Sequence, residues 1–306
     1  MKVLIVASYN KNRFAPFIVE QAEALKTQHC EIAWFGLQGK GLMGYLKNLS
    51  ALKKKIQEVH PDVVHAHYGL SGLLANLQRQ VPVVTTYHGS DINDTKALPF
   101  SKMAMHLSAW NIFVSRKTLE IANPRKKYVL LPCGVDMTDL QLTGRNEARQ
   151  KLNLSEAKKY VLFAGAFDNA VKNAPLAKEA ISLLQDDKVD LLELKGYSRE
   201  EVTLLMCAAD AFLMTSLTEG SPQVIKEAMA CGCPIVSVDV GDVKERTEDV
   251  DGCYVTETRE PQELSELLKK AISFEGKTKG REKIIAEGLD NRKVAAELRG
   301  IYDRIV

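Results

Sequence analysis

The sequence predicts an α/β protein of two doubly wound, Rossmann-like domains that face each other across a cleft. Its length of 306 residues is too great for one ordinary core and suits two domains. Short β-branched apolar runs alternate with amphipathic stretches in both halves, which is typical of parallel sheets covered by helices. Residues 1–150 carry a net charge of +8 and residues 151–306 one of −6. We therefore expect the two domains to face different partners.

The first half contains six short apolar runs that are bounded by polar or turn residues, as strands of a buried sheet are. The predicted strands are Lys2–Ser8, Glu31–Phe35, Asp62–Ala66, Val83–Tyr87, Asn111–Ser115 and Tyr128–Leu131. Apolar side chains at helical spacing predict helices over Phe14–Thr27 and Tyr45–Val59.

The second half repeats this rhythm after a polar stretch, Asp136–Lys151, that predicts a linker. We therefore place the first domain at residues 1–147 and the second at residues 148–291. The predicted strands of the second domain are Tyr160–Ala164, Asp190–Lys195, Ala211–Thr215 and Ile235–Asp239, and the predicted helices are Pro175–Leu184, Glu200–Ala208 and Gln223–Cys231. A last helix is predicted over Arg292–Ile305.

The composition is that of a globular protein, with 45% apolar and 26% charged residues. No apolar run approaches the roughly 20 residues that a membrane-spanning helix needs, and the N-terminal run is followed by no signal-peptide cleavage site. We therefore expect a cytoplasmic protein. The six cysteines are scattered and show no disulfide framework, so we expect reduced thiols.

Two motifs resemble cofactor or metal sites, and we interpret both as structural. The segment Gly39–Gly44 fits G-x-G-x-x-G, but it follows the second strand, and the next strand ends without an acidic residue for a ribose. A loop that opens a helix is the better interpretation. We expect His65 and His67 to point to opposite faces of their strand, so that the two do not bind one ion.

Two further motifs point the same way. Cys231 and Cys233 are followed by no second Cys or His pair at finger-like spacing. Asp249 and Asp251 resemble a metal-binding pair but precede Gly252, which favours a turn. We therefore expect neither a metal nor a cofactor.

The segment between Thr215 and Ala230 is the most informative. A strand ends at Thr215, a loop of small residues turns, and a helix begins near Gln223, so that backbone N–H groups at its N-terminus can bind a phosphate. Glu219 precedes this helix, and Glu227 lies inside it, where it could accept hydrogen bonds from ribose hydroxyls. An ordinary capped helix with surface carboxylates is the alternative that spacing alone leaves open.

Lys172 adds weight to a phosphate site. It follows the predicted strand Tyr160–Ala164 and a short loop. A lysine at the carboxyl end of a strand can reach a diphosphate at that sheet edge and neutralise its charge. A plain surface lysine is the alternative.

Glu219 and Glu227, within the run E-G-S-P-x4-E-A-M-A-x-G-x-P-I-V, resemble the donor-site signature of the retaining family 4 glycosyltransferases, which have the GT-B fold. The likeness extends over nearly the whole chain. Further segments with counterparts in the family are Val161–Gly165 with Lys172 and Asn173, Asp239–Glu245, Asp251–Gly252, Pro61–His67, Tyr87–Asp91 and Leu131–Asp136.

In the second domain, the resemblance implies a donor site for a nucleoside-diphosphate sugar. Lys172 would hold the diphosphate, Glu227 the ribose, and Glu219 the sugar, with Lys172 and Glu219 among the catalytic residues. The loop with Gly196 and Tyr197 would border the nucleobase. The backbone that would hold the sugar and the phosphates comes from Gly220, Ser221, Pro222, Gln223 and Val224.

In the first domain, the resemblance implies that catalytic His88 approaches the reacting sugar and that Asp91 supports it or the acceptor. Asn10, Arg13 and His67 would lie on the acceptor side. The final helix, 292–306, would pack back on this domain.

The sequence departs from the family in two places. Ala166 stands where the family has an arginine in its phosphate loop, and the loop 8–14 lacks the usual double glycine. Asn10 and Arg13 are candidates to contribute in its place.

The resemblance implies a retaining, metal-independent transfer of a hexose from a UDP- or GDP-sugar to an acceptor hydroxyl. A glycan or a lipid-linked glycan of bacterial cell-surface polysaccharide or glycolipid synthesis is the expected acceptor, and no nucleic-acid partner is expected. A nucleotide-sugar epimerase of the same fold and a non-catalytic homologue that binds a nucleotide sugar are the alternatives.

Four lysines, Lys47 and Lys53 to Lys55, lie on or beside the predicted helix Tyr45–Val59. They form either the solvated face of a helix packed on the core or a contact with an anionic membrane surface, where each lysine contributes about 1 kcal/mol. In the second case the protein would be peripheral at the inner face of the membrane.

Overall fold

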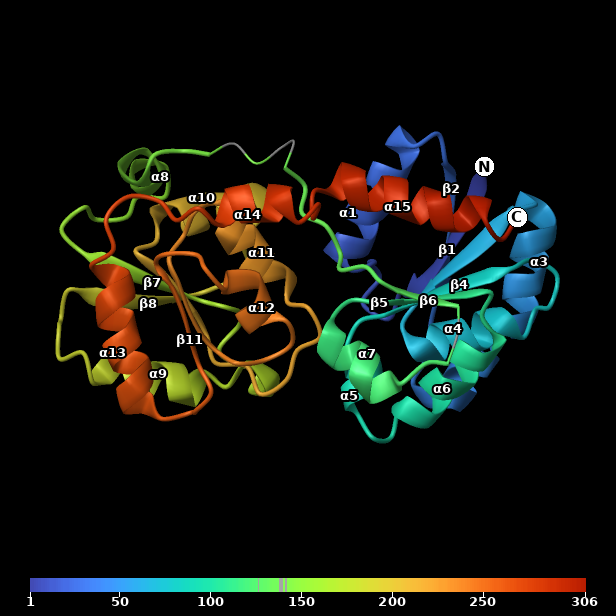
Figure 1. Cartoon of the computed structure of the whole chain (residues 1–306), viewed down its shortest axis with the longest axis horizontal. Helices are drawn as coiled ribbons and strands as arrows, with labels where there is room; N and C mark the ends of the chain where they lie inside the picture. Colours follow the sequence, from blue (N-terminus) through green and yellow to red (C-terminus); the bar gives the residue numbers. More distant parts are fainter. Residues whose placement is uncertain (126, 138–139, 141) are drawn as a thin grey trace. The chain divides into compact units, whose positions relative to one another are not determined.

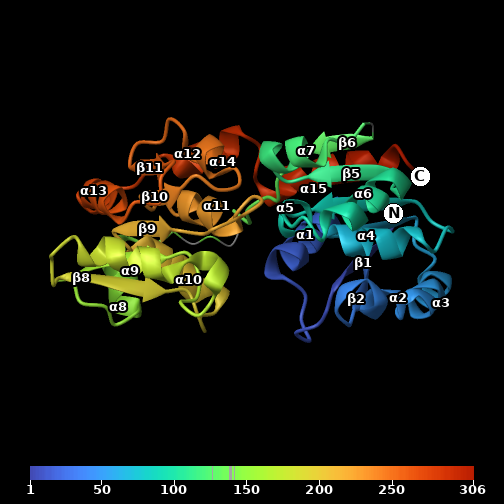
Figure 2. The same cartoon turned by 90° about the horizontal axis from the view of Figure 1, so that it is seen from below.

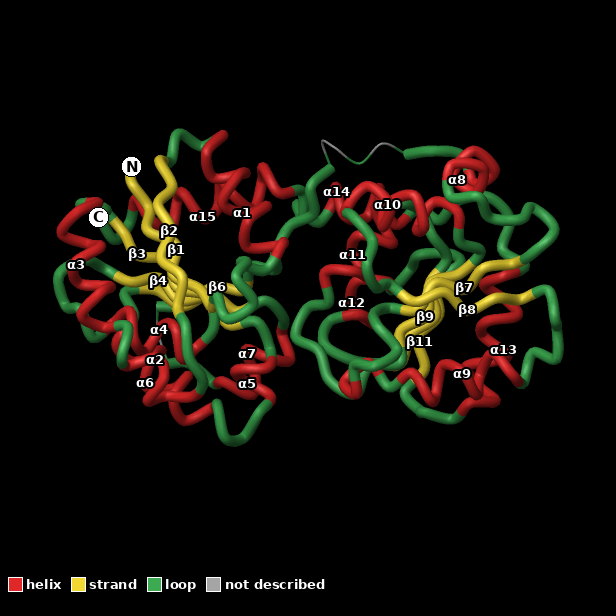
Figure 3. Tube along the Cα trace, turned by 180° about the vertical axis from the view of Figure 1, so that it is seen from behind, coloured by secondary structure: helices red, strands yellow, loops and turns green. Residues whose placement is uncertain are grey.

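The computed structural model describes residues 1–125, 127–137, 140 and 142–306. The chain divides into two compact units, which are described separately (Figure 1). Unit 1 comprises Met1–Gly134 and Leu289–Val306, and unit 2 comprises Val135–Gly288. Each unit has a parallel sheet with helices on both sides (Figure 3), which confirms the predicted pair of α/β domains.

The described part of unit 1 has a six-stranded sheet in the order β2-β1-β3-β4-β5-β6, with parallel pairing throughout. Its strands are β1 (Lys2–Ser8), β2 (Glu31–Leu37), β3 (Val63–His67), β4 (Val83–Tyr87), β5 (Trp110–Phe113) and β6 (Tyr128–Leu130). The order reverses between β1 and β3, and ligands of such sheets bind beyond the carboxyl ends of the strands at this switch point. His67 ends β3, and the segments that follow β1 and β4 carry Asn10 and His88.

Successive side chains of β1 fill two cores. Val3, Ile5 and Ala7 pack under α1 (Pro16–Thr27) and the C-terminal helix α15 (Asn291–Asp303). Leu4 and Val6 pack on the opposite face, under α3 (Leu49–Val59) and α4 (Gly69–Asn76). This alternation follows from the two-residue period of a strand. The remaining helices of unit 1 are α2 (Gly41–Leu46), α5 (Ser90–Asn93), α6 (Leu98–Leu107) and α7 (Arg116–Ala122).

The predicted helix Tyr45–Val59 is wrong in one respect, because the structure has two helices there, α2 and α3. Asn48 separates them. Its side-chain amide donates hydrogen bonds to the carbonyls of Gln38 (2.9 Å), Gly44 (3.0 Å) and Tyr45 (3.1 Å). An asparagine that bonds backbone carbonyls in this way competes with helix continuation.

The expectation that His65 and His67 point to opposite faces of their strand is also wrong. Their rings stack with centroids 4.5 Å apart. Residues two apart in a strand share one face, since the side chains alternate with a period of two.

The described part of unit 2 has a five-stranded sheet in the order β11-β10-β9-β7-β8, again with parallel pairing. Figure 2 shows its strands running from β8 through β9 and β10 to β11. The strands are β7 (Lys159–Phe163), β8 (Val189–Glu193), β9 (Ala211–Met214), β10 (Ile235–Val238) and β11 (Cys253–Thr256), the last of which the sequence analysis missed. The switch point lies between β7 and β9.

The helices of unit 2 surround this sheet. They are α8 (Arg145–Lys151), the 3-10 turn η1 (Ala170–Lys172), α9 (Ala174–Ser182), α10 (Arg199–Ala208), α11 (Gln223–Ala230), α12 (Val243–Thr247), α13 (Pro261–Ile272) and α14 (Gly280–Ala286). Helix α9 packs against α13, and α11 against α14.

The boundary between the units precedes the predicted one at residue 147, because the predicted linker contains α8, which packs on α10 in unit 2. The guanidinium of Arg149 lies 2.6 Å from the carboxylate of Asp210, whose side chain is fully buried. Arg145 and Lys159 also pair with this carboxylate, at 3.5 and 3.4 Å. The chain returns to unit 1 at Leu289.

Within the described residues, no helix has both the length and the apolar character needed to cross a bilayer. The six cysteines, all within the described ranges, are free thiols.

Candidate functional site

Lys172 and Glu219 form an ion pair at the carboxyl edge of the unit 2 sheet. The Nζ of Lys172 lies 2.7 Å from Oε1 of Glu219, and the two side chains are 19% and 18% exposed. Lys172 ends η1 after β7, whereas Glu219 lies in the loop after β9. Thr215 ties these segments together, because its hydroxyl reaches the backbone carbonyls of Lys172 (2.9 Å) and Asn173 (3.0 Å).

Gly165 lets the Lys172 side chain lie close to the backbone. A Cβ at position 165 would come within 2.9 Å of Cγ of Lys172, so any larger residue would displace the lysine. Ala166 follows directly, and its methyl group supplies no charge at the place where the family resemblance implies an arginine.

Glu227 lies on the inner side of α11 and is 6% exposed. Its Oε1 accepts a hydrogen bond from Nη1 of Arg199 at 2.8 Å, and Arg199 is 52% exposed at the start of α10. Its Oε2 is buried and has no hydrogen-bond partner among the described residues, and the same holds for Oγ of Ser216. An unpaired buried polar atom costs about 1–3 kcal/mol. A ligand with hydroxyl groups would satisfy these atoms.

The loop between β9 and α11 is held by its neighbours. The guanidinium of Arg259 donates to the carbonyls of Ser216 (2.9 Å) and Leu217 (3.2 Å). The hydroxyl of Ser221 donates to Asp242 at 2.8 Å, and burial raises the pKa of that carboxyl. Gly241, with a φ of +56°, approaches so closely that a Cβ there would lie 2.6 Å from the carbonyl oxygen of Gly220.

The other predicted donor residues surround this loop. Pro222 is the N-cap of α11, and Gln223 and Val224 begin the helix, so that its N-terminus follows directly on the loop after β9. Gly196, with a φ of +84°, and Tyr197, which is 43% exposed, lie in the loop before α10. The Arg199–Glu227 pair brings the start of α10 to α11.

In unit 1, Asp91 fixes the backbone around His88. Its buried carboxylate accepts hydrogen bonds from the N–H groups of Gly69 (2.8 Å), His88 (3.0 Å) and Gly89 (2.9 Å). Burial raises the pKa of Asp91 to about 6, although the three N–H groups act in the opposite direction. Asp91 thus supports His88 through the main chain.

His88 packs among aromatic rings. Its ring centroid lies 5.0 Å from that of Phe17 and 4.6 Å from that of Tyr68. Its Nε2 lies 3.0 Å from Nδ1 of His67, which is 1% exposed, and its Nδ1 lies 3.9 Å from Sγ of Cys133. The structure therefore brings His67, His88 and Asp91 together.

Asn10 and Arg13 lie in the loop after β1. The side chain of Asn10 donates to the carbonyl of Gly39 (2.9 Å) and accepts from its N–H (2.8 Å), so that it joins this loop to the glycine-rich turn before α2. Arg13 is exposed.

Several residues that hold the two sites were not predictable from the sequence. Arg199 and Arg259 reach their partners across long sequence separations, and nothing in their local spacing signals this role. His65 bonds the hydroxyl of Tyr302 on α15 at 2.6 Å, a contact that only the packing of the last helix creates. Among the described residues, no group of three or more His, Cys, Asp or Glu side chains converges as a metal site would require.

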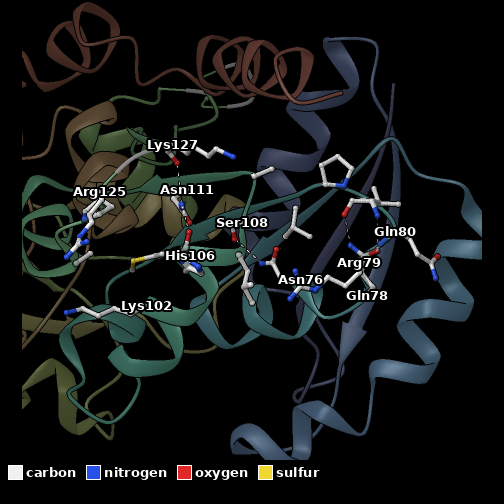
Figure 4. A pocket seen from close by; sticks show the side chains of 18 of the residues that line it. Asn76, Gln78, Arg79, Gln80, Lys102, His106, Ser108, Asn111, Arg125 and Lys127 are labelled. Carbon is white, nitrogen blue, oxygen red and sulfur yellow. Dashed lines mark hydrogen bonds between the residues drawn. The ribbon is translucent and has the colours of Figure 1, made fainter.

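A groove of about 1220 Å³ lies at the amino edge of β4 to β6, at the opposite end of these strands from His88 (Figure 4). Helices α4, α6 and α7 end here. The basic side chains that line it are Arg79, Lys102, His106, Arg125 and Lys127, and none of the described lining residues is acidic. Cations beside helix C-termini complement the helix dipoles, which accounts for their sign.

Two family models match the chain: "Glycosyltransferase Family 4" over residues 6–139 and "Glycosyl transferases group 1" over residues 189–273. Together they cover more than two thirds of its length. The putative teichuronic acid biosynthesis glycosyltransferase TuaC of Bacillus subtilis is 28% identical over 218 residues, which are 62% of this chain and 56% of TuaC. This match therefore spans little more than half of that relative.

Two solved structures share the fold over their whole length. Sucrose-phosphate synthase from Thermosynechococcus elongatus superposes with a TM-score of 0.82 at 17% identity, over 100% of this chain and 99% of that one. HepE of Anabaena, solved in complex with UDP, superposes with a TM-score of 0.74 at 17% identity, over 99% and 100%. Fold, motifs and family models agree, and the chain belongs to family 4 of the glycosyltransferases, with the two domains of the GT-B fold.

Proposed function

We propose that unit 2 holds a nucleoside-diphosphate sugar and that the enzyme transfers the sugar to an acceptor hydroxyl held by unit 1, with retention of configuration and without a metal. One observation supports the proposed donor site. Two carboxylates, Glu219 and Glu227, are each paired with a cation at the carboxyl edge of one sheet, and a buried oxygen of Glu227 has no partner among the described residues.

The donor diphosphate would bind the ammonium group of Lys172. A phosphate group carries more charge than Glu219 and competes with it for the ammonium, which frees the carboxylate to accept hydrogen bonds from the sugar. The N–H groups at the start of α11, the helix that follows the Glu219 loop, favour the same anion. Lys172 and these N–H groups would stabilise the charge that develops on the leaving diphosphate.

The donor ribose would donate hydrogen bonds to Glu227. Arg199 occupies Oε1 and thereby orients the carboxylate, while Oε2 remains for the ribose hydroxyls to donate to. A hydrogen bond to a charged acceptor contributes about 1.5–3 kcal/mol. Uracil is the donor base that we favour first, because HepE, which shares the fold, was solved with UDP.

In the proposed reaction, the acceptor hydroxyl attacks the anomeric carbon on the face that the diphosphate leaves. The bond from the anomeric carbon to the phosphate oxygen breaks as the new glycosidic bond forms, and the acceptor proton passes to the departing phosphate oxygen. His88 would contact the sugar, and Asp91 would hold the turn that carries it.

The acceptor we propose is a glycan of cell-surface polysaccharide synthesis, either free or lipid-linked, because TuaC is named for teichuronic acid biosynthesis.

Peripheral membrane contact through α3 is a separate proposal. Leu52 and Ile56 of α3 are buried and Lys54 is exposed, as in a helix packed on the core with a basic outer face. Flotation with anionic and neutral vesicles tests it, and equal recovery with both would remove it.

The donor proposal is tested by a thermal-shift panel of UDP, GDP, ADP and CMP with EDTA present throughout. A ligand at 100 times its Kd adds about 2.7 kcal/mol to the native state, which raises Tm by a few degrees in a domain of this size. A shift with one diphosphate names the base for assays with the labelled sugar donor. The absence of a shift with every nucleotide, in a folded sample, would overturn the donor site.

Product analysis then separates the remaining possibilities. The proton NMR coupling of the new anomeric centre must show the configuration of the donor, and an inverted centre would overturn retention. A donor whose sugar changes configuration without an acceptor would indicate an epimerase. Binding without turnover on any acceptor would indicate a non-catalytic homologue.

A further inference from the structure

Three histidines follow one another at the carboxyl edge of the unit 1 sheet. His65 and His67 come from β3, and His88 directly follows β4. The ring centroids of His65 and His67 are 4.5 Å apart, and those of His67 and His88 are 5.2 Å apart. His65 and His67 are 0% and 1% exposed, so their hydrogen bonds with neighbouring groups determine which ring nitrogen carries the proton.

His65 is anchored from both sides. Its Nδ1 lies 2.6 Å from the hydroxyl of Tyr302 on α15, and its Nε2 lies 2.7 Å from the hydroxyl of Thr86 on β4. Burial raises the pKa of Tyr302 well above its usual value, so the phenol keeps its proton and donates it to Nδ1. Burial also lowers the pKa of His65 to about 3. His65 is therefore neutral, with its proton on Nε2, where it donates to Thr86.

His67 has one partner and one orphan nitrogen. Its Nδ1 lies 3.0 Å from Nε2 of His88, whereas its own Nε2 is buried and has no hydrogen-bond partner among the described residues. Burial lowers the pKa of His67 well below its usual value, and the neighbouring His65 and His88 add to this. The ring is therefore neutral and carries one proton.

The proton of His67 can lie on Nε2 or on Nδ1, and the two arrangements differ in energy. A proton on Nε2 would leave a buried N–H without an acceptor, which is rarer in proteins than an under-used acceptor. A proton on Nδ1 uses the N–H in the bond to His88 and leaves only a lone pair unpaired. The second arrangement is favoured, and it makes Nε2 of His88 the acceptor.

We propose that His67 is a positioning residue that donates its Nδ1 proton to Nε2 of His88 and thereby fixes the His88 ring with its own proton on Nδ1. The stack on His65, anchored by Thr86 and Tyr302, keeps His67 in place. In this tautomer Nδ1 of His88, which lies 3.9 Å from Sγ of Cys133, carries the proton, and the Nε2 lone pair is occupied, so that His88 serves as a hydrogen-bond donor and not as a general base. The catalytic consequence rests on the proposed function; the proton positions do not.

The proton positions are measurable in the free protein. Long-range 1H–15N NMR spectra of protein labelled with 15N-histidine distinguish the protonated from the unprotonated nitrogen of each ring. We expect the proton on Nδ1 in His67 and His88 and on Nε2 in His65. A proton on Nε2 of either His67 or His88 would overturn the proposal, whatever the activity of the enzyme.

Two substitutions separate positioning from packing. His67→Asn keeps an N–H near the position of Nδ1 and should retain the His88 proton on Nδ1, whereas His67→Leu removes the donor and should give a mixture of both His88 tautomers. For His67→Leu we expect kcat to fall about tenfold with the donor KM unchanged, the effect of losing one hydrogen bond in the transition state. His67→Asn should restore most of kcat.

An unchanged kcat in His67→Leu would overturn the positioning role. If that variant fails to fold, the wild-type tautomers and His67→Asn still decide the question. If the tautomers are as expected but no transfer occurs with any donor, the proposed function fails and the histidine arrangement stands.

Discussion

The Nζ of Lys172 lies 2.7 Å from Oε1 of Glu219, and this pair joins the segment after β7 to the segment after β9 at the switch point of the unit 2 sheet. Both side chains are less than one fifth exposed. The cation that we assign to the donor diphosphate and the carboxylate that we assign to the sugar thus hold each other in position, and a donor would exchange this contact for two of its own.

Replacement of Lys172 by alanine removes the cation proposed for the leaving diphosphate. Loss of one group that stabilises transition-state charge typically lowers kcat by about 10²–10³, and we expect that loss here in a steady-state transfer assay. Lys151→Ala is the matched control, because Lys151 lies in the same unit and is 52% exposed in a helical pair with Glu147. Equal rates for the two variants would contradict the role of Lys172.

Replacement of Glu227 by glutamine tests ribose recognition through a cycle of variant and ligand. The wild type should bind the 2′-deoxy or the 3′-deoxy form of its nucleotide about tenfold or more weakly, the effect of one lost bond to a charged acceptor. Glu227→Gln should discriminate much less. The exposed Glu266 supplies the control variant Glu266→Gln. Discrimination that is the same in the wild type and in Glu227→Gln, measured by calorimetry, would place the ribose elsewhere.

Replacement of Arg149 by methionine tests the packing of α8 in unit 2. Arg149 is 4% exposed and pairs with Asp210, which also accepts the N–H of Tyr160 at 2.8 Å. Breaking a buried pair at one partner costs about 3–5 kcal/mol, and the neighbouring Arg145 and Lys159 place the expected loss at the lower end. Urea unfolding followed by circular dichroism measures it. A change in unfolding free energy of less than about 1 kcal/mol, as for most surface substitutions, would contradict the account.

Acid should destabilise unit 1 through His65 and His67, whose pKa values burial lowers, and for His65 the size of the effect follows from its pKa. Its pKa is about 3 in the folded chain and near 6.5 when unfolded, so the unfolded state binds more protons between these values and stability falls as the pH is lowered through this window. At pH 5 the loss is roughly 2 kcal/mol, at 1.36 kcal/mol for each pH unit below 6.5. Asp91 acts the other way below about pH 6, because its folded pKa is raised and the folded state binds the extra proton.

The variant His65→Gln separates the contribution of His65 from that of His67, whose pKa burial also lowers, since glutamine does not titrate. The slope of unfolding free energy against pH, measured between pH 5 and 7, should be shallower in His65→Gln than in the wild type. Identical slopes would show that His65 is not the group responsible.

Local patterns predicted much of the sheets. The predicted bounds of β1 and β4 match the structure, because β1 has a continuous apolar run, β4 is rich in β-branched residues, and both end at polar turns. Strand β11 (Cys253–Thr256) was missed because it is only four residues long, and its apolar run of three is too short to indicate a strand. The break at Asn48 depends on a bond to Gln38 from the preceding strand's end, which no helical spacing shows.

The site was predictable as far as its motifs and no further. Glu219, Glu227 and Lys172 follow strand ends, and parallel strands bring such residues to one edge. Their partners come from packing instead. Arg199 reaches Glu227 only because α10 begins beside α11, and Tyr302 reaches His65 only because α15 lies on α1 in unit 1 (Figure 1).

We propose that the donor binds unit 2 at the segments 164–173 and 215–227. The most direct test is titration of 15N-labelled, deuterated protein with UDP and GDP in the presence of EDTA, followed by amide chemical shifts. We expect saturable shifts concentrated in these two segments and in the start of α10, with smaller shifts elsewhere. Shifts confined to unit 1, or no shifts with any nucleotide, would contradict it.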